Sequence, residues 1–258
     1  MTPHLFHALL AAVVLALPSA IAFKKGDVSL HKRSVTLTGR SLDGKSDVRF
    51  VFKPTEQAEI RDVNARGEAT IVTSCVSMEI VQDGRTEKLE NAQFPPTTRV
   101  FSKSGLVLRE IDGTENALEP LLVVEGLTAN TPMPPESGEA PGSWRTDMQN
   151  RLTPGQRVTM VSRTIGAETV FGIKTVMMAF TLEVPTTPAQ LPNETISAKG
   201  ERWIDISTGR IVKSDIELNN VAFPFRGSMI IGKVHILDEI IVPGVNEKTT
   251  GAPAPVQR

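Results

Sequence analysis

Apolar and polar residues alternate along most of this chain, from Asp27 to Val242. No apolar pattern with the 3.6-residue period of a helix persists for even three turns. The alternation is clearest at residues 47–53 and 175–184, where apolar side chains fall on one face and charged or hydroxyl side chains on the other. Strands of this kind bury one face and expose the other, which is typical of antiparallel sheets.

Turn residues separate the expected strands. The Asp-Gly pair within residues 82–85 predicts a two-residue hairpin, because a type I′ turn requires two positive φ angles. Residues 102–105 and 207–210 predict two more hairpins. The best helix candidate is short, Pro120 to Glu125. We therefore expect a mainly β protein with antiparallel sheets of about a dozen strands, arranged as two half-barrel-like halves with one or two short helices.

The N-terminus predicts export. An apolar run from Leu5 to Leu17 is followed by Pro18 and by Ala20-Ile21-Ala22, the small-x-small pattern that signal peptidase recognises. We expect residues 1–22 to be a signal peptide cleaved after Ala22, although no Lys or Arg precedes the apolar run. The run is too short to span a bilayer as a helix, and no cysteine near the site offers a lipid anchor. The expected product is soluble, without a transmembrane anchor, and periplasmic or extracellular.

Composition shifts divide the rest of the chain. Residues 130–155 are rich in Pro and Gly and predict a linker between an N-terminal β half, 23–129, and a C-terminal β half, 156–242. Residues 243–258 are expected to be a disordered tail. The five residues from Asn64 to Glu68 resemble those from Ser197 to Glu201, which raises the question of a duplication.

Charge and cysteine content exclude several classes of protein. The chain has 28 Lys and Arg against 29 Asp and Glu, a net charge of -1, so it lacks the basic surface that nucleic acid or an anionic membrane requires. Its single cysteine, Cys75, cannot form an intramolecular disulfide. Cys75 lies in an alternating strand and is expected to be a small buried side chain of low reactivity.

No catalytic residue is predicted. Beyond Ala22 only His31 and His235 remain as imidazoles, and no G-x-S-x-G motif supplies a serine nucleophile. The sequence also lacks the closely spaced ligands of a zinc site and the acidic loop of a calcium site, so no metal or other cofactor is expected. A pair of carboxylates facing each other across a groove, as in glycosidases, stays open as an alternative.

One tryptophan and one acid are the candidate ligand contacts. Trp203 and Asp205 share one face of an expected strand, an arrangement compatible with binding a ligand such as a sugar ring. The competing interpretation makes Trp144 and Trp203 anchors of the core and Asp205 a turn residue that accepts hydrogen bonds from backbone amides.

Three short motifs resemble a loosely defined class of bacterial exported proteins without assigned function. They are residues 63–71, residues 141–144, and residues 200–205 together with 208–211. That class is similar in architecture to the lipoprotein carriers and receptors of the bacterial envelope. The resemblance implies a half-barrel that carries a lipid, and it implies no catalytic residue.

The leading interpretation is a non-enzymatic exported β-protein of the bacterial envelope. Its partner would be a lipid or other apolar ligand held in the concave sheet, or an envelope protein. The alternatives are a structural or interaction module of an envelope assembly and a carboxylate-dependent hydrolase. An apolar cavity inside the sheet would favour the first, a flat face with an open strand edge the second, and a groove with two acids the third.

Overall fold

One antiparallel sheet of twelve strands forms the part of the chain that the computed structural model describes. The described residues are 18–246, except 43, 45, 83, 91–94, 113–127, 136–141, 151–154, 186–194 and 226–227. The strands are β1 (Val28–Ser41), β2 (Asp47–Val63), β3 (Ala69–Gln82), β4 (Arg85–Glu90), β5 (Thr97–Phe101), β6 (Val107–Asp112), β7 (Ser143–Gln149), β8 (Arg157–Val170), β9 (Ile173–Pro185), β10 (Thr195–Asp205), β11 (Ile211–Phe225) and β12 (Ser228–Ile240).

The order of the strands is β6-β5-β3-β2-β1-β12-β11-β10-β9-β8-β7, with β4 paired to β3. The first half of the chain runs outward from β1, and the second half returns from β7 to β12. The two halves meet where β1 pairs with β12, from His31 opposite Ile240 to Ser41 opposite Ile230. The predicted mainly β, antiparallel fold is confirmed, and the sheet is open rather than closed into a barrel.

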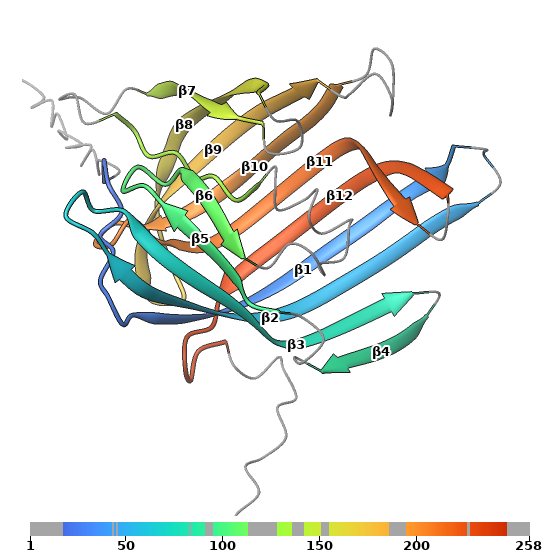
Figure 1. The fold of residues 1–258 in the computed structure, drawn as a ribbon, viewed down its shortest axis with the longest axis horizontal. Helices are drawn as coiled ribbons and strands as arrows, with labels where there is room; N and C mark the ends of the chain where they lie inside the picture. The colour runs from blue at the N-terminus through green and yellow to red at the C-terminus, as the bar shows by residue number, and fades with distance from the viewer. Residues whose placement is uncertain are drawn as a thin grey trace, which may run out of the picture.

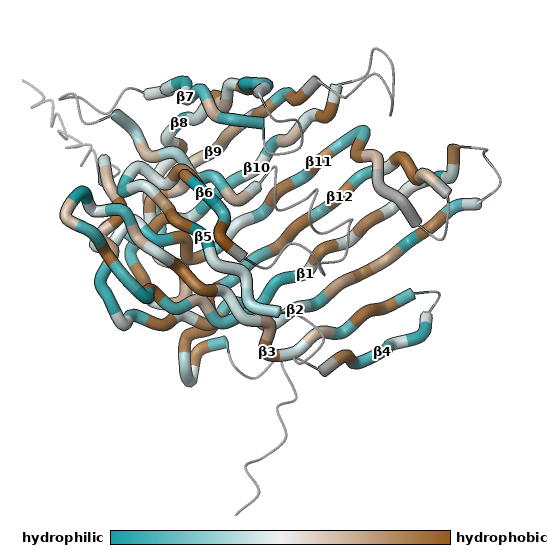
Figure 2. The backbone as a smooth tube through the Cα atoms, viewed as in Figure 1, coloured by the Kyte–Doolittle hydropathy of each residue, from teal (hydrophilic) through white to brown (hydrophobic). Residues whose placement is uncertain are grey.

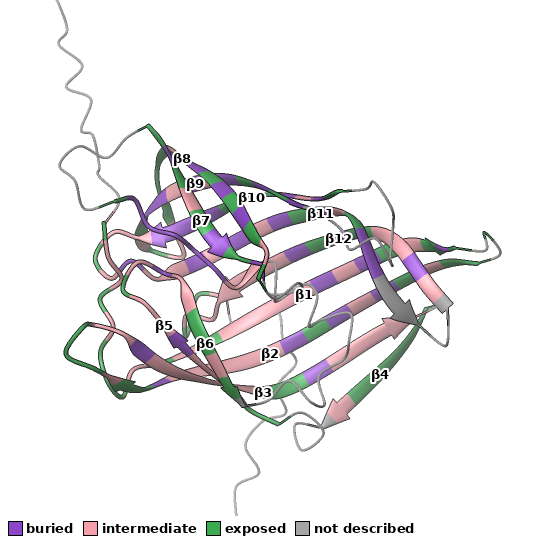
Figure 3. Cartoon of the chain, turned by 45° about the horizontal axis from the view of Figure 1, so that its top comes forward, coloured by how far each residue is buried: buried purple, intermediate pink, exposed green. Residues whose placement is uncertain are grey.

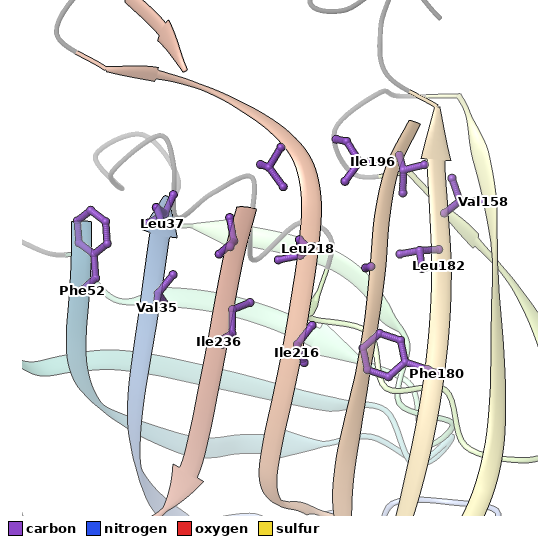
Figure 4. Close-up of a cluster of buried hydrophobic side chains, with 14 of the residues drawn as sticks. Val35, Leu37, Phe52, Val158, Phe180, Leu182, Ile196, Ile216, Leu218 and Ile236 are labelled. Atoms are coloured by element: carbon purple, nitrogen blue, oxygen red, sulfur yellow. The ribbon is translucent and has the colours of Figure 1, made fainter. Parts of the chain in front are cut away.

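The alternation in the sequence becomes two faces of this curved sheet (Figure 2). Inward-facing side chains of the central strands form bands of buried residues across β1, β2, β11 and β12 (Figure 3). Figure 4 shows the main cluster, which includes Leu37, Phe52, Phe180, Leu218 and Ile236. Each of these side chains is at most 6% exposed. Burial of this face is the main stabilising contribution to the fold.

The sheet curls, so that β5 and β6 lie across the interior from the lower parts of β9 to β11 (Figures 1 and 4). The sheet changes direction at the strand β3. Its first half pairs with β5 and its second half with β4, and β-bulges interrupt its pairing with β2 between Thr55 and Glu56 and between Ile60 and Asp62. Bulges increase local twist and bend a strand, so they account for the curl that encloses an interior.

The three predicted hairpins are all present. They join β3 to β4, β5 to β6 and β10 to β11, and each contains a glycine with positive φ: Gly84, Gly105 and Gly209. The helix candidate Pro120 to Glu125 lies outside the described residues. The two similar pentapeptides differ in structure, because Asn64 to Glu68 form a turn and Ser197 to Glu201 lie within β10.

The Pro-rich segment 130–155, which we expected to link two halves, contains structure that the sequence did not indicate. The strand β7 lies within it, and residues 130–134 are buried. Thr131 and Met133 donate backbone hydrogen bonds to Gly105 and Ser104, so this segment packs on the β5–β6 turn. At the other end, the expected tail begins with a turn at residues 243–246, and residues 247–258 lie outside the described part.

Candidate functional site

A row of polar side chains crosses the otherwise apolar inner face. Arg33 of β1, Asp238 of β12, Ser214 of β11 and Arg202 of β10 are successive cross-strand neighbours in the ladder. Strand alternation directs all four to the same side of the sheet. Charged groups here are removed from water, which is costly unless they are paired or serve a ligand.

Arg202 is the most buried charged residue of this row, at 1% exposure. Its two terminal nitrogens donate hydrogen bonds of 2.7 Å to the backbone oxygens of Asn130 and Thr128, and its guanidinium lies 4.5 Å from the ring centre of Phe180. Its Nε has no hydrogen-bond partner among the residues that the structure describes. Burial lowers the pKa of Arg202 to about 10, against the opposing effect of Asp238, so the group stays cationic at neutral pH.

Asp238 is held ionised by its neighbours. Burial alone would raise its pKa, but the neighbouring Arg33 and His31 outweigh this effect and lower the pKa below 3.8. The Asp238 oxygens lie 3.6 Å from Arg33 Nη2 and 3.5 Å from His31 Nδ1. Glu56 also binds Arg33, at 3.2 Å. Arg33 therefore has two carboxylate partners, whereas the ion pairs of the described residues give Arg202 none.

Two adjoining cavities lie between this row and the strands that face it. The first, of about 160 Å³, has a mixed lining that includes the charged side chains of Arg33, Glu56, Arg202 and Asp238, with Arg99 of β5 opposite. The second, of about 220 Å³, is mainly apolar. Its apolar walls are Ile21, Phe23, Ala58, Ile60, Ile71, Phe101, Ala129 and Ile211.

The two cavities have four lining residues in common: Thr73, Phe101, Ala129 and Ile211. They are therefore neighbours, one apolar and one charged. The hydroxyl of Thr131, which lines the apolar cavity, is buried and finds no hydrogen-bond partner in the described part of the chain. An ion pair between Asp27 and Arg210 lies at the wall of the same cavity. This arrangement can accommodate a molecule with an apolar chain and one polar end.

The structure places the two predicted ligand contacts, Trp203 and Asp205, away from these cavities. Trp203 is 9% exposed, donates a hydrogen bond to Glu168, and has the ammonium of Lys213 5.0 Å from its ring centre. Asp205 accepts hydrogen bonds from the backbone amide of Ser207 and the hydroxyls of Ser207 and Thr208. These contacts are those of a core anchor and a turn residue, and a ligand-binding role for either stays a prediction.

A larger hollow, of about 710 Å³, is lined mainly by outward-facing residues of β8 to β11 and contains Glu201, Asp215 and Glu217. Two of these acids have basic partners: Asp215 lies 2.8 Å from His235, and Glu217 lies 2.8 Å from Lys199. The hydrogen bond from Lys199 lowers the pKa of Glu217. A glycosidase requires an acid with a raised pKa, so the chemistry of Glu217 is the opposite of what that alternative needs.

Among the residues that the structure places, no three His, Cys, Asp or Glu side chains are grouped to hold a metal ion. Cys75 is half-buried and contacts the main apolar cluster. Burial, and then the charge of Glu56, raise the pKa of its thiol to about 11. In the same described part of the chain, no helix has the length and apolar character to cross a membrane.

The sequence analysis did not identify the row of charges. One signal for it was present: Arg202 interrupts the inward positions of β10, which otherwise hold Ile196, Ala198, Gly200 and Ile204. Asp238 likewise follows Val234 and Ile236 at inward positions of β12. A charged residue at a position that the alternation assigns to the core indicates either an internal ion pair or a ligand contact.

The fold and the cavities define a class of protein: an open antiparallel half-barrel with an enclosed interior. No protein-family model matches the sequence, and no curated protein matches it either. Among solved structures, lipovitellin is similar over 85% of this chain with a TM-score of 0.52 and 9% identity. The chain spans only 25% of the lipovitellin chain. This likeness shows a shared fold.

Two bacterial structures are also similar to this chain. A protein from Bacteroides fragilis, described as exported and as having a YmcC-like fold, is 13% identical, with 86% of this chain and 100% of that chain covered and a TM-score of 0.34. A protein from Parabacteroides distasonis, described as a lipoprotein, is 11% identical, with 87% and 100% covered and a TM-score of 0.31. The structural neighbours thus include proteins described as exported or as lipoproteins.

Proposed function

We propose that this protein is a non-enzymatic, exported β-protein of the bacterial envelope that binds a single-chain amphiphile, such as a fatty acid, inside its half-barrel. The observation that carries the proposal is the pair of adjoining cavities, one apolar and one lined by three arginines and two acids, of which Arg202 is fully buried. The apolar chain would occupy the cavity walled by Ile60, Ile71 and Phe101. The polar head would lie at the end formed by Arg202 and Arg33.

The size of the cavities supports a single chain rather than a lipid with several chains. Ligand pockets for drug-sized molecules are typically about 300 to 1,000 Å³, and the apolar cavity is about 220 Å³.

The charge of the site supports an acidic head. Arg202 is cationic at neutral pH and takes part in no ion pair of the described residues, so an anion nearby would gain an interaction that is strong in a water-poor site.

The envelope location rests on the expected signal peptide, residues 1–22. Cleavage after Ala22 would remove Ile21 from the apolar cavity and leave its other seven apolar wall residues in place. The lipid class has a further support. Lipovitellin, which has a similar fold, is known from a structure concerned with its lipid–protein interactions. Because fold alone does not determine function, the cavities of this chain carry the proposal.

The test is displacement of a fluorescent long-chain fatty acid from the purified protein by lauric acid, dodecanol and dodecylamine, which share one chain length. We expect lauric acid to bind at least about tenfold more tightly than dodecylamine, a difference of about 1.4 kcal/mol, because the arginines favour an anionic head. The affinity for dodecanol should lie between those for lauric acid and dodecylamine. If none of the three compounds displaces the fluorescent fatty acid, the proposal is refuted.

A matched pair of variants locates the site. Ala58→Phe adds a ring inside the apolar cavity, and Ala179→Phe adds the same ring on the outer face of β9. We expect the first variant to weaken binding by about tenfold or more and the second to leave it unchanged. Equal losses in both variants, with both folded by circular dichroism, would place the ligand elsewhere.

A further inference from the structure

Two opposite charges face the same small cavity without pairing with each other. Arg202 of β10 and Asp238 of β12 both line the cavity of about 160 Å³. They are close enough to interact, because burial lowers the pKa of Arg202 and the charge of Asp238 partly opposes this effect. The ion pairs of the described residues nevertheless include none between these two side chains.

The strand order explains the gap between the two charges. Ser214 of β11 lies between them, paired with Arg202 on one side and with Asp238 on the other. Two strand spacings, about 10 Å, therefore separate the Cα atoms of Arg202 and Asp238. The short side chain of Ser214 also lines the cavity and leaves space between the two longer ones. Ile216 and Ile236 (Figure 4), the next inward residues of the same two strands, line the cavity as well.

Each charge is held in place by other partners. The terminal nitrogens of Arg202 donate hydrogen bonds to two backbone oxygens within residues 128–130, so the guanidinium cannot turn toward Asp238 without breaking them. Asp238 lies beside Arg33 and His31. The two charges are therefore fixed on opposite sides of the gap.

One donor and one acceptor are left over at this gap. Within the described part of the chain, Nε of Arg202 and Oδ1 of Asp238 are buried atoms without a hydrogen-bond partner. Arg202 is only 1% exposed, so bulk solvent does not reach its Nε. A buried polar atom without a partner costs free energy. A ligand head that accepts a hydrogen bond from Arg202 and donates one to Asp238 would remove both costs.

We propose that the amphiphile bound by this protein is a hydroxy acid, with its hydroxyl on carbon 2 or carbon 3 of the acyl chain. The carboxylate accepts a hydrogen bond from Nε of Arg202, and the hydroxyl donates one to Oδ1 of Asp238. This inference rests on the proposed function and specifies the head group of its ligand.

The charges at the gap favour this head over three simpler ones. A plain carboxylate can bind Arg202, but it has no proton to donate to Asp238. An alcohol can donate to Asp238, but it leaves the buried cation of Arg202 without an anion. An amine can pair with Asp238, but it is repelled by Arg202 and Arg33. Only a head with both an anion and a hydroxyl satisfies both sides.

The test compares lauric acid with its 2-hydroxy and 3-hydroxy derivatives and with the two corresponding methoxy acids, in the displacement assay on the wild-type protein. A methoxy oxygen can accept a hydrogen bond but has no proton to donate. We expect the better of the two hydroxy acids to bind at least about fivefold more tightly than lauric acid. Its methoxy counterpart should bind no more tightly than lauric acid.

The outcomes separate this inference from the proposed function. If lauric acid binds and neither hydroxyl improves the affinity, or if the methoxy group improves it equally, the hydroxy-acid inference is overturned and the binding of an amphiphile stands. If none of the five acids displaces the fluorescent fatty acid, both are overturned.

A matched pair of variants assigns the effect to Asp238. Asp238→Asn removes the charged acceptor and keeps the shape, whereas Glu239→Gln removes a charge from the next residue of β12, which faces the other side of the sheet. We expect the first to reduce the affinity ratio of hydroxy acid to lauric acid by at least about threefold, because hydrogen bonds to charged groups are the stronger ones. The second should leave the ratio unchanged.

A purely structural role of Asp238 would lower both affinities together and leave their ratio unchanged. An unchanged ratio in a folded Asp238→Asn protein, or an equal fall in both variants, therefore overturns the inference. If Asp238→Asn does not fold, the comparison of hydroxy and methoxy acids on the wild-type protein decides it.

Discussion

Asp238 and its partners show how charged side chains are kept inside an apolar sheet. We expect Asp238→Asn to lower the free energy of unfolding at pH 7 by about 2 to 3 kcal/mol, because it leaves Arg33 and His31 without this carboxylate. The pKa of Asp238 is lowered in the folded state, so its contribution is present at neutral pH and is lost as the pH falls through that value.

Urea unfolding of the wild type and of Asp238→Asn at several pH values measures this effect. The difference between the two proteins should narrow as the pH falls below 3.8, the ordinary value for this carboxyl. A constant difference from pH 7 to pH 3, or none at pH 7, would show that Asp238 does not stabilise the fold as an ion.

The thiol of Cys75 should react slowly in the native protein. Its pKa of about 11, compared with 9.0 for a free thiol, implies roughly 100-fold less thiolate at neutral pH. Labelling with a thiol reagent at pH 7.5 should therefore be slow in buffer and fast in urea, and Cys75→Ala should cost about 1 kcal/mol. Rapid labelling of the folded protein would contradict this placement.

Both tryptophans are buried in the structure. We expect Trp144→Ala and Trp203→Ala each to lower the free energy of unfolding by about 3 to 5 kcal/mol, because both side chains are more than nine-tenths buried. Trp203→Phe, which loses only the hydrogen bond to Glu168, should cost about 1 kcal/mol. A fully stable Trp203→Ala variant would return Trp203 and Asp205 to the candidate ligand contacts.

At the scale of elements, the strands and hairpins could be predicted because their signals are local. Alternation assigned the strands, and glycines that require positive φ marked the turns at Gly84, Gly105 and Gly209. The pairing of β1 with β12 could not be predicted, since it joins residues about 200 positions apart and leaves no local pattern. The candidate site depends on this pairing, because it brings Arg33 beside Asp238.

Residues 130–134 show a second limit of sequence interpretation. Their prolines predicted an extended linker, and a segment without regular structure can also be buried when its backbone groups find partners. Here Arg202 binds the oxygens of Thr128 and Asn130, and the amides of Thr131 and Met133 bind the β5–β6 turn. Only the folded structure brings these partners together.

The close approach of β1 and β12 can be tested by substitution of a glycine. Gly39 lies opposite Gly232, and a Cβ atom at Gly232 would lie 2.0 Å from the oxygen of Thr38 and 2.6 Å from Cα of Gly39. We expect Gly232→Ala to lower the free energy of unfolding by about 3 kcal/mol. Gly166→Ala, in β8, is the control, because nothing lies within 4 Å of its added methyl group. Similar stability of the two variants in urea would show that β1 and β12 do not approach so closely.

At the scale of the whole molecule, the curl of one sheet produces the interior. The bulged strand β3 places β5 opposite the strands β10, β11 and β12. The cavities lie between β5 and these three strands. Neither wall could enclose a ligand alone, since an open sheet offers only a surface. Binding should therefore depend on the two halves of the chain being joined through β1 and β12.

The measurement that tests the amphiphile proposal most directly is native mass spectrometry of the protein purified, without detergent, from its native host. We expect one population with the mass of the chain plus that of one single-chain amphiphile, which lauric acid displaces and which the Ala58→Phe variant lacks. A single species with the mass of the bare chain, unchanged after addition of lauric acid, would contradict the proposal that the half-barrel binds an amphiphile.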